Sequence, residues 1–184
     1  MASLRVFIEN KLADYMPDDP QKSVSCDDIA KQAEMDTECC FRILRACALT
    51  QIVHHDESET RNFHLSQHGQ LLKSDHPSMT YYNIYLRLVL FDPAFAVLPK
   101  ATKTPPQIAF EMLHDTKSYQ YFEKHPEKME IFQKAITHMS ICDGNAIVKV
   151  AKEFHLFDEY SSFIDVAGGH GQLMKLFKNN SKYY

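Results

Sequence analysis

The sequence predicts a mainly α-helical chain whose last part begins an α/β unit. Two observations support this prediction. Apolar residues recur at the spacing of helix faces through most of the 184 residues. Near the carboxyl end, an apolar run over residues 163–167 leads into three of the five glycines, which fall within residues 168–171. An apolar strand, a glycine-rich loop and a helix in that order bring backbone N–H groups up to a nucleotide-like ligand.

Composition and charge argue against several kinds of protein. A hydrophobic content of 45% suffices for a packed core, and a net charge of -4 argues against a nucleic-acid-binding surface over the whole chain. Residues 1–12 include charged side chains, unlike a signal peptide, and no segment has the ~20 apolar residues that span a bilayer. Five cysteines without CxxC spacing fit free thiols in a reducing cytosol better than metal ligands. We therefore expect a cytoplasmic protein with no metal and no membrane or nucleic-acid partner.

Three helices are predicted near the amino terminus. Apolar residues at helical spacing indicate a helix over residues 4–12. Ser25, followed three residues later by Asp28, resembles a capping box and starts a second helix. Asp36 or Thr37 caps a third helix, which has a broad apolar face. Two helices joined by a few residues indicate a helix-turn-helix.

A hairpin completes this first module. Apolar and aromatic residues over 52–55 and 62–65 flank a polar turn, so residues 1–75 are predicted to form a winged helix-turn-helix. Such a module can bind DNA or mediate dimerisation. Residues 1–75 carry eight Lys and Arg against thirteen Asp and Glu, a net charge of -5, which is the wrong sign for reading a DNA groove. Packing or dimerisation is the better interpretation.

Residues 76–157 are predicted to be almost wholly helical, with a break near Asp143 and Gly144. So much apolar helical surface indicates a large subunit interface or the wall of a pocket. Plain helical core remains an alternative for any single residue in this region.

Five segments in order give the chain a resemblance to a known family. The sequence resembles the S-adenosylmethionine-dependent, cation-independent O-methyltransferases of the plant caffeate and animal hydroxyindole type, over essentially its whole length. The segments are LRVF at 4–7, FRILRACAL at 41–49, FHLSQHGQLLKSDHP at 63–77, FQKAI at 132–136 and FIDVAGGHG at 163–171. The resemblance implies a helical dimerisation region, followed over residues 158–184 by the first strand and helix of a Rossmann-like methyltransferase domain. It also implies methylation of a hydroxyl group on a small aromatic molecule.

The resemblance assigns candidate residues for binding S-adenosylmethionine. They are Ser140, Asp165, Gly168, Gly169 and Gly171. A carboxylate beside the loop can accept hydrogen bonds from the ammonium group of the methyl donor, or it can only brace the turn by accepting from loop N–H groups.

One residue departs from the family pattern in the loop. Ala167 stands where the family usually has glycine, and its methyl group fits if φ is negative there.

Three residues upstream resemble positions at which the family's helical domain covers the methyl donor and the acceptor. They are Phe132, Ile136 and Met139, with Ile136 in place of the more usual methionine. Ordinary core packing is the alternative for all three.

The resemblance also implies that the catalytic half of the enzyme lies beyond this sequence. Only 22 residues run from Phe163 to Tyr184, whereas the family's ribose-binding acid and its catalytic histidine lie further on. No residue here is assigned a catalytic role, and binding of S-adenosylmethionine by the 184-residue chain is in doubt. We expect either an inactive piece of an O-methyltransferase or a truncated, non-catalytic family member. The latter would serve as a dimerisation or regulatory partner, forming a homodimer or a heterodimer with a full-length relative, or would be a gene remnant.

Overall fold

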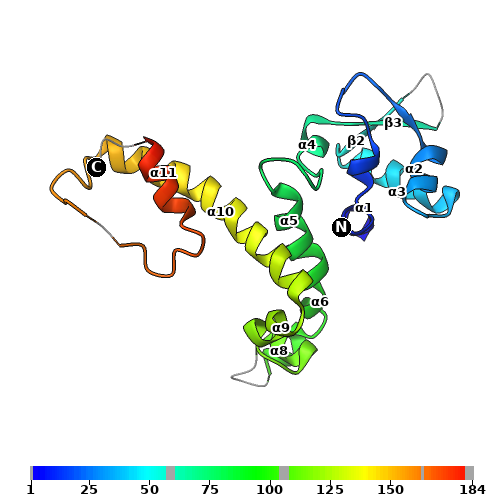
Figure 1. The fold of residues 1–184 in the computed structure, drawn as a ribbon. Helices are drawn as coiled ribbons and strands as arrows, with labels where there is room; N and C mark the ends of the chain where they lie inside the picture. The colour runs from blue at the N-terminus through cyan, green and yellow to red at the C-terminus, as the bar shows by residue number, and fades with distance from the viewer. Residues whose placement is uncertain (1, 57–60, 104–107, 163, 181–184) are drawn as a thin grey trace.

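The fold is mainly helical with one small sheet, as predicted. The computed structural model describes residues 2–56, 61–103, 108–162 and 164–180. An amino-terminal module of helices and strands lies at one end (Figure 1), and the long helix α10 (Pro126–Glu153) runs away from it beside α5 (Thr80–Tyr85). The last helix, α11 (Gln172–Asn180), packs on the far half of α10. Among the described helices, none combines the length and hydropathy that crossing a bilayer requires.

Two helices of the amino-terminal module begin at the predicted caps, Ser25 and Asp36. The Ser25 hydroxyl accepts the Asp28 N–H at 3.1 Å, and the Asp36 carboxylate accepts the Cys39 N–H at 2.8 Å. Each bond satisfies an N–H group that the first helical turn leaves without a backbone partner. The elements are α1 (Ala2–Glu9), η1 (Leu12–Tyr15), α2 (Cys26–Gln32) and α3 (Thr37–Leu49).

A three-stranded antiparallel sheet closes this module. The predicted hairpin forms from β2 (Val53–His55) and β3 (Asn62–Leu65), and β3 also pairs with the two-residue strand β1 (Val24–Ser25), which was not predicted. Alternate residues of β3 are buried, so one face of the sheet covers the helices.

Just after the sheet, two hydrogen bonds of Ser66 and a close backbone contact at Gly69 hold the chain in place. The Ser66 hydroxyl donates to the Gln51 carbonyl at 2.7 Å and accepts the N–H of Gly69 at 3.0 Å, which starts α4 (Gln67–Gln70). A Cβ atom built on Gly69 would lie 2.1 Å from the carbonyl oxygen of Ile52. The backbone of α4 therefore sits directly against the residue that precedes β2.

The central helical run changes pitch along its length. It passes without a break from α5 through a π-helical segment, η2 (Leu86–Phe91), into α6 (Asp92–Phe95). Three short helices follow it along the chain, and the last two lie below it in Figure 1. They are α7 (Leu98–Ala101), α8 (Ala109–His114) and α9 (Ser118–Lys124).

The predicted break in α10 near Asp143 and Gly144 is wrong, because the helix is continuous through both residues. A Cβ atom built on Gly144 would lie 2.6 Å from Leu176 Cδ1 of α11. The missing side chain thus lets the two helices approach closely, and Val148 and Phe177 are buried at the same contact. Gly144 serves packing between helices rather than helix termination.

The predicted strand before the glycine loop is also wrong over residues 164–166, and Phe163 lies outside the described residues. Residues 164–166 are not in a strand, and the side chains of Ile164 and Val166 are 87% and 86% exposed. A strand needs a neighbour to share its backbone hydrogen bonds, and the three strands of the described chain lie in the distant amino-terminal sheet. The helix predicted after the loop does form, as α11.

Candidate functional site

The glycine loop and α10 line a partly open cavity of about 600 Å³, here called the loop cavity. Asp165, Gly168 and Gly169 line it from the loop, and Ser140 lines it from α10. Four of the five predicted methyl-donor residues therefore face one space, although they lie up to 29 positions apart in the sequence. The fifth, Gly171, is not part of the lining.

The Asp165 carboxylate lies over the α-carbon of Gly168. A Cβ atom built on Gly168 would be 2.3 Å from Asp165 Oδ2, so any side chain there would displace the carboxylate. The loop turn is closed by the backbone, since the Gly171 N–H donates to the Gly168 carbonyl at 2.9 Å. Within the described ranges, the carboxylate of Asp165 has no hydrogen-bond partner. The hydrogen bond that closes the loop turn therefore comes from the backbone, while the Asp165 carboxylate lies against Gly168 and lines the loop cavity.

The loop backbone enters the left-handed region three times. Gly169 has a φ of 55° and Gly171 has a φ of 68°. A Cβ atom at either position would have no atom within 4 Å, so backbone conformation, and not lack of space, favours glycine there. Ala167 also has a positive φ, of 64°. The methyl group of Ala167 was expected to fit if φ were negative. Because φ is positive, the loop holds a strained alanine where the backbone favours glycine.

Replacing Ala167 with glycine is expected to stabilise the chain by about 1 kcal/mol, because it removes the left-handed strain of a residue with a Cβ atom. The free energy of unfolding in urea, followed by circular dichroism, measures the effect. The matched control is Ala146→Gly on the exposed face of α10, where the same change is expected to destabilise by about 1 kcal/mol. A loss of stability in both variants would contradict the assignment of strain to Ala167.

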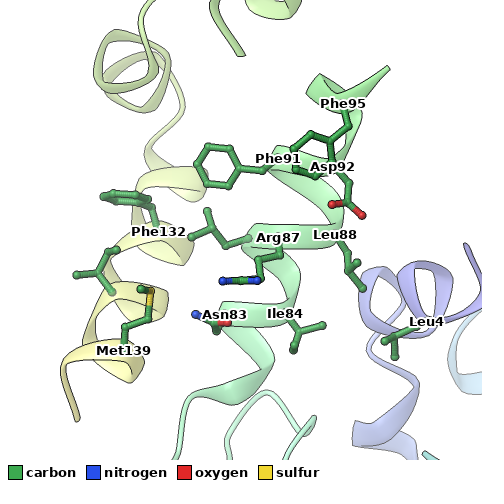
Figure 2. A pocket seen from close by; sticks show the side chains of 12 residues that line it. Leu4, Asn83, Ile84, Arg87, Leu88, Phe91, Asp92, Phe95, Phe132 and Met139 are labelled. Atoms are coloured by element: carbon green, nitrogen blue, oxygen red, sulfur yellow. The ribbon is translucent and has the colours of Figure 1, made fainter. Parts of the chain in front are cut away.

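A second cavity, here called the apolar cavity, lies next to the first. It has a volume of about 630 Å³ and lies between α10 and the α5–η2–α6 run (Figure 2). Phe132, Ile136 and Met139 line it from α10, and Phe132 and Ile136 also line the loop cavity. Ile136 and Met139 are each 41% exposed, so neither is an ordinary core residue in the described chain.

Buried aromatic packing holds Phe132 in place. The rings of Phe122 and Phe132 are stacked with their centroids 4.8 Å apart, and Phe122 is buried with Leu86 and Leu90. These contacts join α9, α10 and η2 behind the wall that the two cavities share.

A polar contact adds to this attachment of α10. The Lys134 ammonium group pairs with Glu130 at 2.7 Å and donates to the Tyr82 hydroxyl of α5 at 3.1 Å. The Glu130 carboxylate is the main cause that raises the pKa of Lys134, so this lysine stays charged at neutral pH.

Sequence reasoning missed several lining residues. Gln133 and Thr137 extend the α10 wall of the loop cavity, while Asn83 and Arg87 project into the apolar cavity. Gln133 and Thr137 could have been found from their spacing of four residues, which places them on one face of α10. Arg87 could have been noticed as the charged residue within the apolar run from residue 84 to residue 91.

The cysteines take no part in either cavity. All five are free thiols, and three of them are buried in the amino-terminal module. Burial raises the pKa of Cys40 to about 12 and that of Cys47 to about 11, which keeps both as neutral thiols. In the part of the chain that the structure describes, no three His, Cys, Asp or Glu side chains gather in a way that could hold a metal ion.

Comparison with known proteins gives relatives of one kind. No family model matches the sequence. Des-methyl DIF-1 methyltransferase A of Dictyostelium discoideum is 23% identical to it over 164 residues, which cover 88% of this chain and 44% of that protein.

The similar solved structures include O-methyltransferases. The match to LaPhzM has a TM-score of 0.80 at 22% identity and covers 97% of this chain and 51% of that one. NcsB1, an O-methyltransferase from neocarzinostatin biosynthesis solved with S-adenosylmethionine and 2-hydroxy-5-methyl naphthoic acid, gives a TM-score of 0.71 at 18% identity, over 99% and 54%. The mitomycin 7-O-methyltransferase MmcR gives 0.76 at 15% identity, over 97% and 50%. The chain spans about half the length of these relatives. Over that length it has the fold of these O-methyltransferases, in agreement with the resemblance seen in its sequence.

Proposed function

We propose that this chain is part of an S-adenosylmethionine-dependent O-methyltransferase of the caffeate and hydroxyindole type, which methylates a hydroxyl group of a small aromatic molecule. The observation that supports the proposal is the loop cavity. It sets Asp165, Gly168 and Gly169 opposite Ser140. In this proposal, residues 158–184 begin the Rossmann-like methyl-donor domain, and α10 separates the methyl donor from the acceptor.

The residues of the loop cavity fit the chemistry of S-adenosylmethionine. The molecule supplies an electrophilic methyl group on a sulfonium centre, and its amino acid portion carries an ammonium group. The unpartnered carboxylate of Asp165 suits that ammonium group, and the hydroxyl of Ser140 has no hydrogen-bond partner within the described segments. The bare Cα atoms of Gly168 and Gly169 allow a ligand to reach the backbone. A volume of about 600 Å³ lies within the usual range for small-molecule sites.

The five glycines offer a direct test of the methyl-donor site. In a chain labelled with ¹⁵N only at glycine, S-adenosylmethionine is expected to shift the amide signals of Gly168, Gly169 and Gly171 in a saturable way. Gly69 is the internal control, because it is buried in the amino-terminal module. The loop signals of Gly168→Ala are expected to show a much weaker response, since the new Cβ atom displaces the Asp165 carboxylate.

Two outcomes would count against the proposal. One is a set of loop signals that do not move at millimolar S-adenosylmethionine, and the other is an equal response in Gly168→Ala. The experiment needs no turnover, so it applies to the chain of 184 residues as it stands.

A non-catalytic role as a dimerisation or regulatory partner is the second candidate. Exposed apolar side chains near the end of the chain favour it, since Phe154 is 64% exposed and Ile164 and Val166 are more exposed still.

We infer that residues 1–75 form a winged helix-turn-helix that serves dimerisation, with itself or with a full-length relative, in the cytoplasm. Sedimentation at micromolar concentration tests this role, and a purely monomeric chain would argue against it.

A further inference from the structure

A histidine and a cysteine of α10 face each other outside the two cavities. Cys142 follows His138 by four residues, a spacing that places both side chains on one face of the helix. The Sγ atom of Cys142 lies 3.8 Å from Nε2 of His138. Neither residue lines the loop cavity or the apolar cavity. The proposed methyl transfer therefore does not account for this pair.

A backbone carbonyl group sets the protonation of the His138 ring. Nδ1 of His138 lies 2.5 Å from the carbonyl oxygen of Ser78, a residue that precedes α5. A carbonyl oxygen only accepts hydrogen bonds, so Nδ1 carries the proton and donates it. In the neutral ring, Nε2 then holds the free lone pair, and this is the nitrogen beside the Cys142 thiol. Histidines that bind metals usually have this arrangement, in which the other ring nitrogen donates to a carbonyl or carboxylate group.

The distance between sulfur and nitrogen suits a shared zinc ion. In tetrahedral sites, zinc binds thiolate sulfur at about 2.3 Å and imidazole nitrogen at about 2.0 Å. At a tetrahedral angle, these bond lengths place the two ligand atoms about 3.5 Å apart. The separation of 3.8 Å between Cys142 Sγ and His138 Nε2 is close to that value. Both atoms can therefore bind one ion without a change in the course of α10.

The pair is accessible, and its ligand types are those that zinc prefers. Cys142 is exposed and His138 is half-buried. No third histidine, cysteine or carboxylate joins them in the described segments, so water would complete a tetrahedral ion. The lack of CxxC spacing argued against metal ligation by pairs of cysteines, but it does not apply to one cysteine and one histidine. Thiolate and imidazole suit zinc, whereas Mg²⁺ and Ca²⁺ prefer oxygen ligands.

We propose that His138 and Cys142 bind a zinc ion on the surface of α10. An S–Zn bond replaces the S–H bond of Cys142, and the proton passes to solvent. Nε2 of His138 gives its lone pair to the same ion, while Nδ1 keeps its proton and its hydrogen bond to Ser78. This zinc site is separate from the proposed methyl-donor site and does not depend on it.

Cobalt(II) provides a spectroscopic probe for the zinc site. We expect Co²⁺, added to the 184-residue chain in a non-thiol reductant, to produce a thiolate-to-cobalt charge-transfer band that saturates at about one ion per chain. Zn²⁺ is expected to abolish the band by competition, and excess Mg²⁺ is expected to leave it unchanged. Calorimetry with Zn²⁺ in two buffers of different ionisation enthalpy should detect the release of about one proton per ion.

Two variants remove one ligand each. Cys142→Ser is expected to abolish the band. His138→Asn is expected to weaken Co²⁺ binding by more than about tenfold, because the loss of even an outer partner of a metal ligand commonly costs that much. The asparagine amide can still donate to the Ser78 carbonyl, so this variant keeps the contact of α10. The controls are Cys39→Ser and His68→Asn, which remove another exposed thiol and another exposed imidazole, and both should keep the band and the affinity.

Four outcomes would overturn the proposal. They are the lack of a charge-transfer band in the parent chain, a band of full intensity in Cys142→Ser, an undiminished affinity in His138→Asn, and saturation at one ion per two chains. The last result would show that the metal bridges two molecules instead of binding within one helix. Because Cys142 is exposed, its replacement by serine does not threaten the fold, and circular dichroism verifies the helix content of each variant.

Discussion

Replacing Phe122 with alanine is expected to lower the free energy of unfolding by about 3–5 kcal/mol. The side chain is 1% exposed and packs with Leu86 and Leu90 behind the apolar cavity, so its removal leaves a large void. The stacked ring of Phe132 loses its support in the same variant. The loss is a large fraction of the 5–15 kcal/mol that is usual for a folded domain.

Urea unfolding followed by circular dichroism measures this loss. The control is Phe154→Ala, which removes the same side chain from a position that is 64% exposed, and it is expected to change stability by less than about 1 kcal/mol. Similar losses of stability in the two variants would show that the aromatic cluster is not the core of this region.

Replacing Gly69 with alanine is expected to destabilise the amino-terminal module by about 3 kcal/mol. The new Cβ atom would lie 2.1 Å from the Ile52 carbonyl oxygen and 3.1 Å from Leu65 Cδ2. The carbonyl cannot move freely, because it accepts the N–H of Ser66 at 3.1 Å. Relief of the clash therefore requires α4 to shift and breaks the hydrogen bonds that Ser66 makes.

The same unfolding experiment tests this second prediction, with His68→Ala as the control on the exposed side of α4. The control is expected to alter stability by no more than about 0.5 kcal/mol. In Gly69→Ala, the ¹⁵N signals of Gly168, Gly169 and Gly171 should keep their positions, since the loop lies far from α4 (Figure 1). A variant as stable as the parent chain would contradict the close contact between α4 and Ile52.

Features governed by neighbouring residues could be predicted from the sequence. The caps at Ser25 and Asp36 depend on side chains that reach three residues along the chain, and both form as predicted. The hairpin likewise needs only two strands and the turn between them. The assembly of the loop cavity was predicted through family resemblance, because no local rule places Ser140 beside Asp165.

Features governed by distant partners could not be predicted in this way. Gly144 looked like a helix break because the sequence does not reveal that α11 packs against it. The strand predicted before the loop depends on neighbouring strands, which the described chain does not place beside Ile164 and Val166. The left-handed φ of Ala167 depends on the path of the whole loop rather than on the preference of alanine.

The wall shared by the two cavities links their ligands thermodynamically. Phe132 and Ile136 line both spaces, so a ligand that shifts either side chain from one cavity changes the shape of the other. By linkage, if a ligand of the apolar cavity changes the affinity for a ligand of the loop cavity by some factor, the second ligand changes the affinity for the first by the same factor. A single turn of α10 can thus make the occupancy of one cavity depend on that of the other, with no movement of domains.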